Sequence, residues 1–181
     1  MQREEVLNLV KKYVKNNNLI KHMFAAEAVM RHFAARFNGD AEQWATAGLV
    51  HDIDAEMTKD SPRLHGEKSA EILKNNGFSD KIIEAVSNHP KDEPAGDEMS
   101  KMLYSADQVT GLIVAGALIH PGKKLALIDK EFILKRFNEK RFAAGANRER
   151  IRAVEKMGIP LDEFIGGALE AMQAASEELG L

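Results

Sequence analysis

Apolar residues recur at intervals of three and four along nearly the whole chain, and this helical periodicity restricts the possible folds most strongly. Alternating apolar and polar runs of the kind that mark β-strands are scarce. At 181 residues the chain is long enough to bury a hydrophobic core as one domain without disulfides or zinc. The sequence therefore predicts a single all-α domain.

Turn and capping residues divide this pattern into helices. Six are expected up to residue 122, at about residues 3–16, 20–37, 40–51, 65–77, 79–89 and 97–120. The third begins with a capping box, because Asp40 is followed three residues later by Gln43. Residues 1–122 are thus expected to form a helical bundle that holds the functional site.

Beyond Gly122 the chain becomes richer in Lys and Arg and its helices become shorter. A last helix is expected from Pro160, with a continuous apolar stripe from Leu161 to Leu179. We expect residues 123–181 to be a helical extension packed on the same domain. The stripe fits either this packing or a homodimer interface.

Composition excludes several classes of function. The chain has no cysteine, so disulfides, thiolate metal sites and cysteine nucleophiles are absent, and His and carboxylates are the strong metal ligands left. A net charge of −3 gives no general attraction to nucleic acid or anionic membranes. The N-terminus is charged and amphipathic, and no stretch elsewhere approaches a membrane-spanning length free of charges. We therefore expect a cytoplasmic protein without a membrane partner.

The dipeptide His51-Asp52 is too short to indicate a function by itself, because such a pair occurs often by chance. The residues around it make it a candidate metal site. It falls where a helix is expected to end, which allows both side chains to approach one ion. His22 lies on the apolar face of its helix and so points inward. Asp107 lies in an apolar helix, where a buried carboxylate is costly unless a cation accompanies it. These four residues are the first predicted metal site.

Two further histidines extend the set. His65 stands at the start of one expected helix and His89 at the end of the next, so both are candidates for binding a second ion, with Asp52 as the bridge. Nitrogen and oxygen ligands of this kind suit a divalent metal such as Mn, Fe, Co, Ni or Zn, with Mg also possible. Taken singly, each histidine is also explained as a hydrogen-bonded core or helix-terminal residue.

The order His22, His51-Asp52, His65, His89, Asp107 resembles the HD-domain superfamily over residues 20–120. In that family a first His, an HD pair and a distal Asp ligate metal in an all-helical domain. The two additional histidines are similar to those of bimetallic members, such as the di-iron diadenosine tetraphosphate hydrolases.

The sequence also departs from particular branches of this family. Pro90 follows the last histidine, where the tetraphosphate hydrolases usually have Thr or a similar residue. Ala55 stands where the single-metal nucleotidases have a Glu. The resemblance therefore implies the chemistry of the superfamily without fixing the substrate.

The expected function is hydrolysis of a phosphate mono- or diester, of nucleotide-like chemistry, by a metal-activated hydroxide. Besides Asp52, the expected catalytic residues are Asp54, to orient the water or protonate the leaving group, and Lys68, to neutralise developing charge. Glu56 is an alternative to Asp54. These roles rest on proximity in the sequence to the predicted ligands.

Two other functions remain open. The site could bind a nucleotide without turnover, as a signalling module, or it could hold two irons that activate dioxygen, as in HD-type oxygenases. The small-residue turn at residues 143–147 lacks the spacing of a phosphate-binding loop, so no function is assigned to it.

Overall fold

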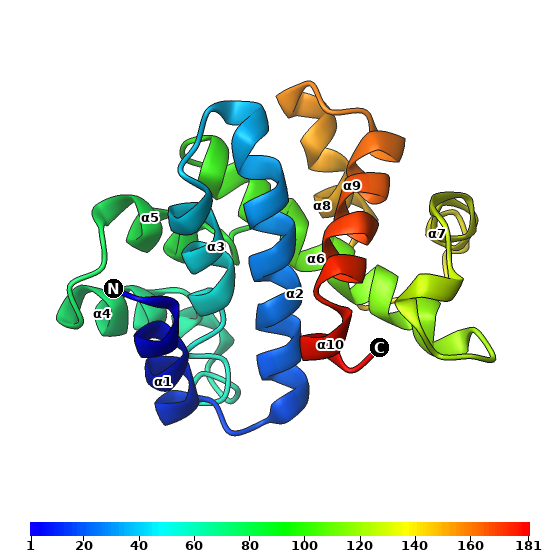
Figure 1. Cartoon of the computed structure of the whole chain (residues 1–181). Helices are drawn as coiled ribbons and strands as arrows, with labels where there is room; N and C mark the ends of the chain where they lie inside the picture. Colours follow the sequence, from blue (N-terminus) through cyan, green and yellow to red (C-terminus); the bar gives the residue numbers. More distant parts are fainter.

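The computed structural model describes all 181 residues and contains helices and turns but no strand, which confirms the all-α prediction (Figure 1). The α-helices are α1 (Arg3–Tyr13), α2 (Asn17–Ala34), α3 (Ala41–Val50), α4 (Glu67–Asn75), α5 (Asp80–Asn88), α6 (Glu98–Ile119), α7 (Lys130–Phe137), α8 (Arg148–Arg152), α9 (Leu161–Ala174) and α10 (Ser176–Leu179). Short 3-10 turns are η1 (Ala35–Phe37), η2 (Pro62–Leu64), η3 (Leu125–Leu127) and η4 (Ala153–Met157).

Side-chain caps fix where several helices begin. The carboxylate of Asp40 accepts hydrogen bonds from the backbone N–H groups of Glu42 and Gln43, and that of Asp97 accepts one from Ser100 N. These bonds satisfy donors that a helix N-terminus otherwise leaves free. The expected capping box of α3 is only half formed, because the Gln43 amide donates to Ser79 Oγ at 3.2 Å instead of turning back to Asp40.

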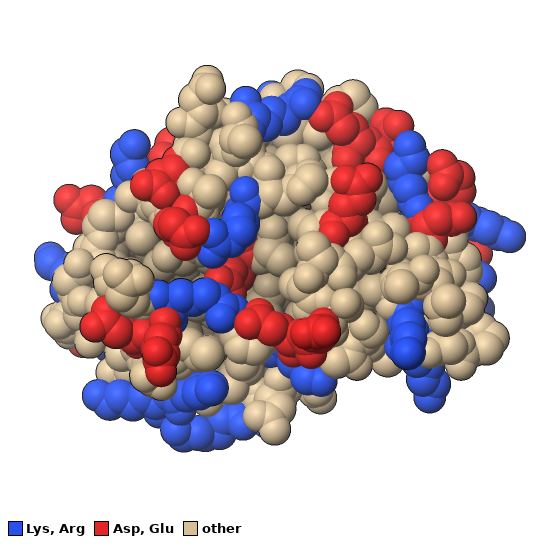
Figure 2. Space-filling model, in the orientation of Figure 1, with Lys and Arg blue, Asp and Glu red and all other residues tan.

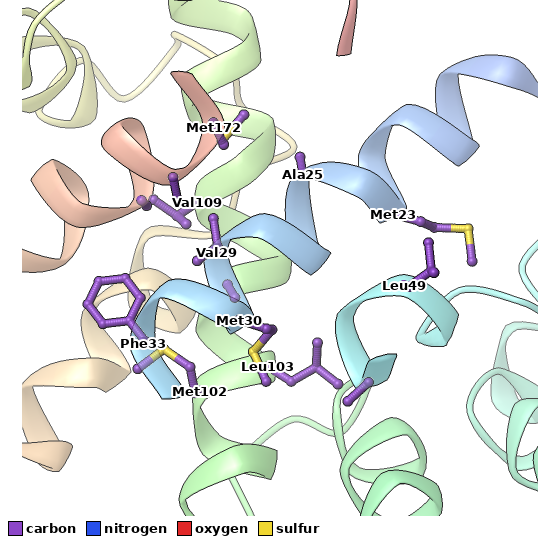
Figure 3. Packing of buried hydrophobic residues seen from close by; sticks show 14 of the residues in the cluster. Met23, Ala25, Val29, Met30, Phe33, Leu49, Met102, Leu103, Val109 and Met172 are labelled. Atoms are coloured by element: carbon purple, nitrogen blue, oxygen red, sulfur yellow. The ribbon is translucent and has the colours of Figure 1, made fainter. Parts of the chain in front are cut away.

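Helix α2 runs through the middle of the bundle and packs against α3, α6 and α9 (Figures 1 and 3). In the close-up, Met23, Val29 and Met30 of α2 lie among side chains of these neighbours, and all three are fully buried. α2 and α3 approach very closely at Gly48, where a Cβ atom would lie 2.6 Å from the carbonyl oxygen of Ala26. This contact brings the C-terminal end of α3 against the middle of α2.

The C-terminal segment packs on the same core, with α9 against α2 and α7 and with α8 against α6. The final helix differs from the expectation of one continuous helix. It is interrupted at Ala175, which has φ −96° and ψ 12°, and the short α10 follows. The change of direction buries Leu179 in the core and places Glu178 2.8 Å from Arg3.

Helix α6 satisfies the length and composition of a membrane-spanning helix, with a mean hydropathy of 1.4 over 18 residues. The sequence expectation concerned segments free of charge, and α6 contains Glu98, Lys101 and Asp107. In addition, 61% of that window is buried inside the structure, and the core helix of a soluble protein passes the same test. α6 contacts α2, α5, α7, α8 and α9, which is the position of a core helix.

Charged side chains of both signs are interspersed on the face of the molecule drawn in Figure 2. No broad region of that face is occupied by Lys and Arg alone. This surface agrees with the small net charge of −3.

Candidate metal centre

Six residues that the sequence singles out meet at one place in the bundle. His22 lies in the first half of α2, His51 directly follows α3, and Asp52 is in the turn after it. His65 precedes α4, His89 directly follows α5, and Asp107 lies in the middle of α6. We call this set the metal-ligand cluster: His22, His51, Asp52, His65, His89 and Asp107.

One half of the cluster is formed around the imidazole of His22. Its Nε2 atom lies 3.1 Å from His51 Nε2 and 3.1 Å from Asp107 Oδ1. Asp52 Oδ2 completes the group at 3.4 Å from His51 Nε2 and 3.6 Å from His22 Nε2. These two nitrogens and two carboxylate oxygens surround one point.

The other half of the cluster is formed around the second oxygen of Asp52. Asp52 Oδ1 lies 3.3 Å from His65 Nε2 and 3.4 Å from His89 Nε2, and these two nitrogens are 3.2 Å apart. The two carboxylate oxygens of Asp52 thus face different groups of ligands. Such a carboxylate has the geometry of a bridge between two neighbouring sites.

The protein fixes the other nitrogen of each imidazole. His51 Nδ1 donates to Gly48 O at 2.8 Å, and His89 Nδ1 donates to Val86 O at 2.6 Å. A carbonyl oxygen can only accept, so the proton of a neutral ring is held at Nδ1 and the lone pair of Nε2 points into the cluster.

The remaining two imidazoles are oriented by side chains. His22 Nδ1 lies 3.1 Å from the hydroxyl oxygen of Thr110, whose own proton is donated to the carbonyl oxygen of Asp107 at 2.7 Å. The Thr110 oxygen therefore accepts from His22. His65 Nδ1 donates to Asp54 Oδ1 at 2.7 Å. When the rings are neutral, all four Nε2 atoms therefore present lone pairs to the interior of the cluster.

Lone pairs at such short separations repel one another unless a positive charge lies between them. The His22–His51 and His65–His89 nitrogen pairs are 3.1 and 3.2 Å apart, with carboxylate oxygens beside both. A divalent cation, coordinated by imidazole nitrogen and carboxylate oxygen, removes this repulsion and suits the ligand types. The residues present therefore fit a metal.

The pKa values of the histidines also show that the cluster favours positive charge. Burial lowers the pKa of His51, but the carboxylates of Asp52 and Asp107 outweigh it and hold that pKa well above its ordinary value. Burial likewise opposes charge on His65, yet Asp52 and Asp54 raise its pKa to about 9. At His89 burial outweighs the attraction of the carboxylates and lowers the pKa.

The carboxylates of the cluster respond in the opposite direction. Burial raises the pKa of Asp52 and that of Asp107, but the neighbouring imidazoles outweigh it and hold both well below the ordinary value. Both groups are therefore ionised at neutral pH and attract cations.

Asp54 lies behind His65 and is fully buried. Its Oδ1 atom binds His65 Nδ1, and its Oδ2 atom accepts 2.9 Å hydrogen bonds from the N–H groups of Gly66 and Ser69. Gly66 has φ +83°, a conformation that glycine adopts readily, and a Cβ atom there would lie 2.8 Å from the Pro90 side chain. The structure thus places Asp54 as a support for His65, away from the open side of the cluster.

The other charged residues near the HD pair lie outside the cluster. Lys68 is 46% exposed, and its ammonium group pairs with Glu71 at 2.6 Å. Glu56 accepts hydrogen bonds from the backbone N–H groups of Lys15 and Asn16, at 2.9 and 2.7 Å, and so fastens the connection between α1 and α2.

Two residues at the site have roles that the sequence reasoning did not anticipate. Thr110 orients His22, and the Gln108 amide donates to Asp107 Oδ2 at 2.7 Å. Thr110 is three residues after Asp107, and this spacing on α6 was the available signal, since residues three apart lie on one helix face.

Comparisons with known proteins identify the family of this chain. The family model of the HD domain matches residues 19–130. Ribonuclease Y of Aliarcobacter butzleri is 29% identical over 123 residues, which are 67% of this chain and 22% of that protein. Ribonuclease Y of Syntrophobacter fumaroxidans is 26% identical over 129 residues, or 71% of this chain and 23% of that protein. No solved structure gives a significant match.

The matches to these curated relatives span no more than about a quarter of the relatives' own length, 18% to 23% in the cases of Nitratidesulfovibrio vulgaris, S. fumaroxidans and A. butzleri. The residues matched by the HD-domain model, 19–130, include all six members of the metal-ligand cluster.

Proposed function

Because this chain belongs to the HD-domain family, we propose that it is a metal-dependent phosphohydrolase that cleaves a phosphate mono- or diester of a nucleotide. One observation supports this most directly. Four imidazoles, each with its Nδ1 atom fixed by the protein, and two carboxylates direct ligand atoms into one partly open cluster. Such a cluster would hold metal ions and leave one side accessible to a substrate, as hydrolysis requires.

In this proposal the cluster holds two divalent ions. His22, His51, Asp52 and Asp107 hold one, and His65, His89 and Asp52 hold the other. Bound ions of this kind supply Lewis acidity and lower the pKa of water towards about 7, which makes hydroxide accessible near neutral pH. The two oxygens of Asp52 support the bridging role, because each faces a different pair of imidazoles.

The chain's own residues position the substrate and the ligands. His22, with a side chain 25% exposed, and His65, 24% exposed, mark the side from which a phosphate reaches the cluster. Asp54 acts through His65, whose ring it orients. A contact between Lys68 and the substrate phosphate remains a prediction. To make it, the exposed ammonium group of Lys68 would have to leave its ion pair with Glu71.

The names of the relatives favour nucleotide chemistry, and the net charge of this chain favours a small substrate. The relatives are named ribonucleases, and cleavage of RNA is hydrolysis of a nucleotide phosphodiester. This chain matches only a part of each, and its net charge of −3 provides no general attraction for a long polyanion. We therefore propose a small nucleotide as the substrate.

The function is tested by elemental analysis of the purified protein, followed by a screen of nucleotides and aryl phosphates with Mn, Fe, Co, Ni, Zn or Mg added to metal-free protein. The Asp52→Ala variant should lose metal and turnover, while its helical circular dichroism persists. Asp60→Ala is the matched control, because Asp60 is exposed in the same loop.

Each outcome of this screen has a distinct meaning. Unchanged metal content and unchanged turnover in Asp52→Ala would refute the proposal. Tight nucleotide binding without released phosphate would indicate a signalling module, and iron with oxygen consumption would indicate an oxygenase.

A further inference from the structure

A recess of about 360 Å³ adjoins the metal-ligand cluster beside α6. Two of the ligands, His22 and Asp107, form part of its wall, so the recess opens directly onto the cluster. The rest of its lining consists of Gln108, Gly111, Ala115, Ala143, Gly145 and Ala146.

The lining of this recess is small and, apart from the two ligands, uncharged. A Cβ atom added at Gly111 or at Gly145 would meet nothing within 4 Å, so open space faces both residues. No Lys or Arg side chain is part of the wall. The recess therefore suits an uncharged group better than a second phosphate, which would also lie near the carboxylate of Asp107.

The far wall comes from the small-residue turn at residues 143–147 and is held rigidly. The guanidinium group of Arg148 donates to the carbonyl oxygens of Ala143 and Ala146 at 2.8 and 2.6 Å. Gln108 accepts from Asn147 N at 2.9 Å and donates to Asp107 at 2.7 Å. The turn is thus tied to a ligand of the cluster, and a wall fixed in advance lowers the entropic cost of binding.

We propose that this recess receives the uncharged organic substituent of the substrate, of the size of a single nucleoside, while the phosphate lies at the metal-ligand cluster. This inference rests on the proposed phosphohydrolase function. A volume of about 360 Å³ falls at the lower end of the range of about 300–1,000 Å³ for small-molecule sites. The substrate class is therefore a nucleoside monophosphate or a similar small phosphomonoester.

The test fills the recess stepwise with Gly111→Ala and Gly111→Leu. Gly111 is exposed within α6, and both residues form helices more readily than glycine, so both variants should fold. Gly111→Leu should raise KM for nucleoside monophosphates at least 10-fold, with Gly111→Ala between it and the parent. Calorimetry should show the same weakening for product nucleoside binding to the metal-loaded protein.

Two measurements should stay unchanged in Gly111→Leu. Metal content and inhibition by inorganic phosphate depend on the cluster alone. Ala144→Leu is the matched control, because Ala144 is exposed in the same turn and lies outside the recess. It should leave KM unaltered.

The results separate this inference from the proposed function. If the parent protein hydrolyses phosphoesters and Gly111→Leu retains its KM and its nucleoside affinity, the recess does not receive the substituent. If the parent binds metal but neither hydrolyses phosphoesters nor binds phosphate, the proposed function fails, and the assignment of the recess fails with it.

Discussion

Each imidazole of the cluster is constrained at one nitrogen so that the other is directed at the cation site. The partners differ in chemistry: carbonyl oxygens for His51 and His89, a carboxylate for His65 and a hydroxyl group for His22. Partners of this kind fix the ring orientation and the tautomer, and they raise the basicity of the ligand. At the scale of single residues, metal affinity therefore depends on atoms that never touch the ion.

Thr110→Val is a direct check of this dependence. The substitution removes the oxygen that accepts from His22 Nδ1 and leaves a side chain of similar shape. Metal affinity should fall by about 10- to 100-fold, the usual effect of losing such a partner. A metal titration on folded protein measures it, and Thr110→Ser should restore affinity. Equal affinity in the parent and in Thr110→Val would contradict the role of Thr110.

Metal binding should release protons and tighten as the pH rises. The pKa of His65 is raised to about 9 and that of His51 is also raised, so in metal-free protein both rings hold protons at pH 7. A ligand nitrogen must lose its proton before it binds metal. Affinity should therefore increase between about pH 7 and 9.

Calorimetric titrations in buffers of different ionisation enthalpy count the released protons. The pairing of protonated His65 with Asp52 and Asp54 also stabilises the metal-free fold at low pH. Because the folded pKa is the higher one, this stabilisation is complete below about pH 6.5 and is lost as the pH rises through about 9. A pH-independent metal affinity would contradict this account.

The convergence of the six side chains of the cluster was predictable from the sequence, whereas most of their supporting contacts were not. His22 was expected to point inward because it lies on the apolar face of its helix. Asp107 was identified because it is a carboxylate in an otherwise apolar helix. The supporting role of Asp54 depends on a turn that brings Gly66 and Ser69 to its carboxylate. That turn has no regular period, so the pattern of residues gave no sign of it.

At the scale of helices, the close contact of α2 and α3 determines where His51 meets His22. Gly48 permits this contact, because a Cβ atom there would lie 2.6 Å from the backbone oxygen of Ala26. The sequence reasoning assigned no role to Gly48, since a glycine inside a helix does not by itself reveal which backbone approaches it. The break at Ala175 was missed for a similar reason, because the apolar stripe continues across it.

Two glycine-to-alanine substitutions within helices should have opposite effects. Gly48→Ala forces α2 and α3 apart and should destabilise the protein by about 1–3 kcal/mol. Gly111→Ala meets open space and should stabilise it by about 0.5–1 kcal/mol, through helix propensity alone. Chemical denaturation of the metal-free proteins measures both. Equal stability of Gly48→Ala and the parent protein would contradict the close contact of α2 and α3 at Gly48.

At the scale of the whole molecule, the cluster joins ligands from α2 and α6 to turns beside α3, α4 and α5. Without a cation, this assembly concentrates two ionised carboxylates and several mutually facing nitrogens. The C-terminal helices share the hydrophobic core of these elements. Loss of metal should therefore weaken the whole fold and not one loop.

Removal of metal with a chelator should lower Tm, and restoring it should raise Tm again. At a free metal concentration of about 100 times Kd, binding stabilises the folded state by about 2.7 kcal/mol. For a chain of this length that corresponds to a shift of about 5–10 °C. Calorimetry with and without chelator measures the shift, with Asp52→Ala as a variant that should respond much less. A Tm that is insensitive to metal in the parent would contradict the role of the cluster.

Two ligands of the cluster, His51 and His89, stand directly after the last residues of α3 and α5. The C-terminal end of a helix bears a partial negative charge of about half a unit, from peptide dipoles that add along the axis. Two such ends converge on the cluster, so the backbone itself attracts a cation there. Replacing any single ligand leaves that attraction in place. Part of the preference of the cluster for a cation therefore comes from the positions at which α3 and α5 end.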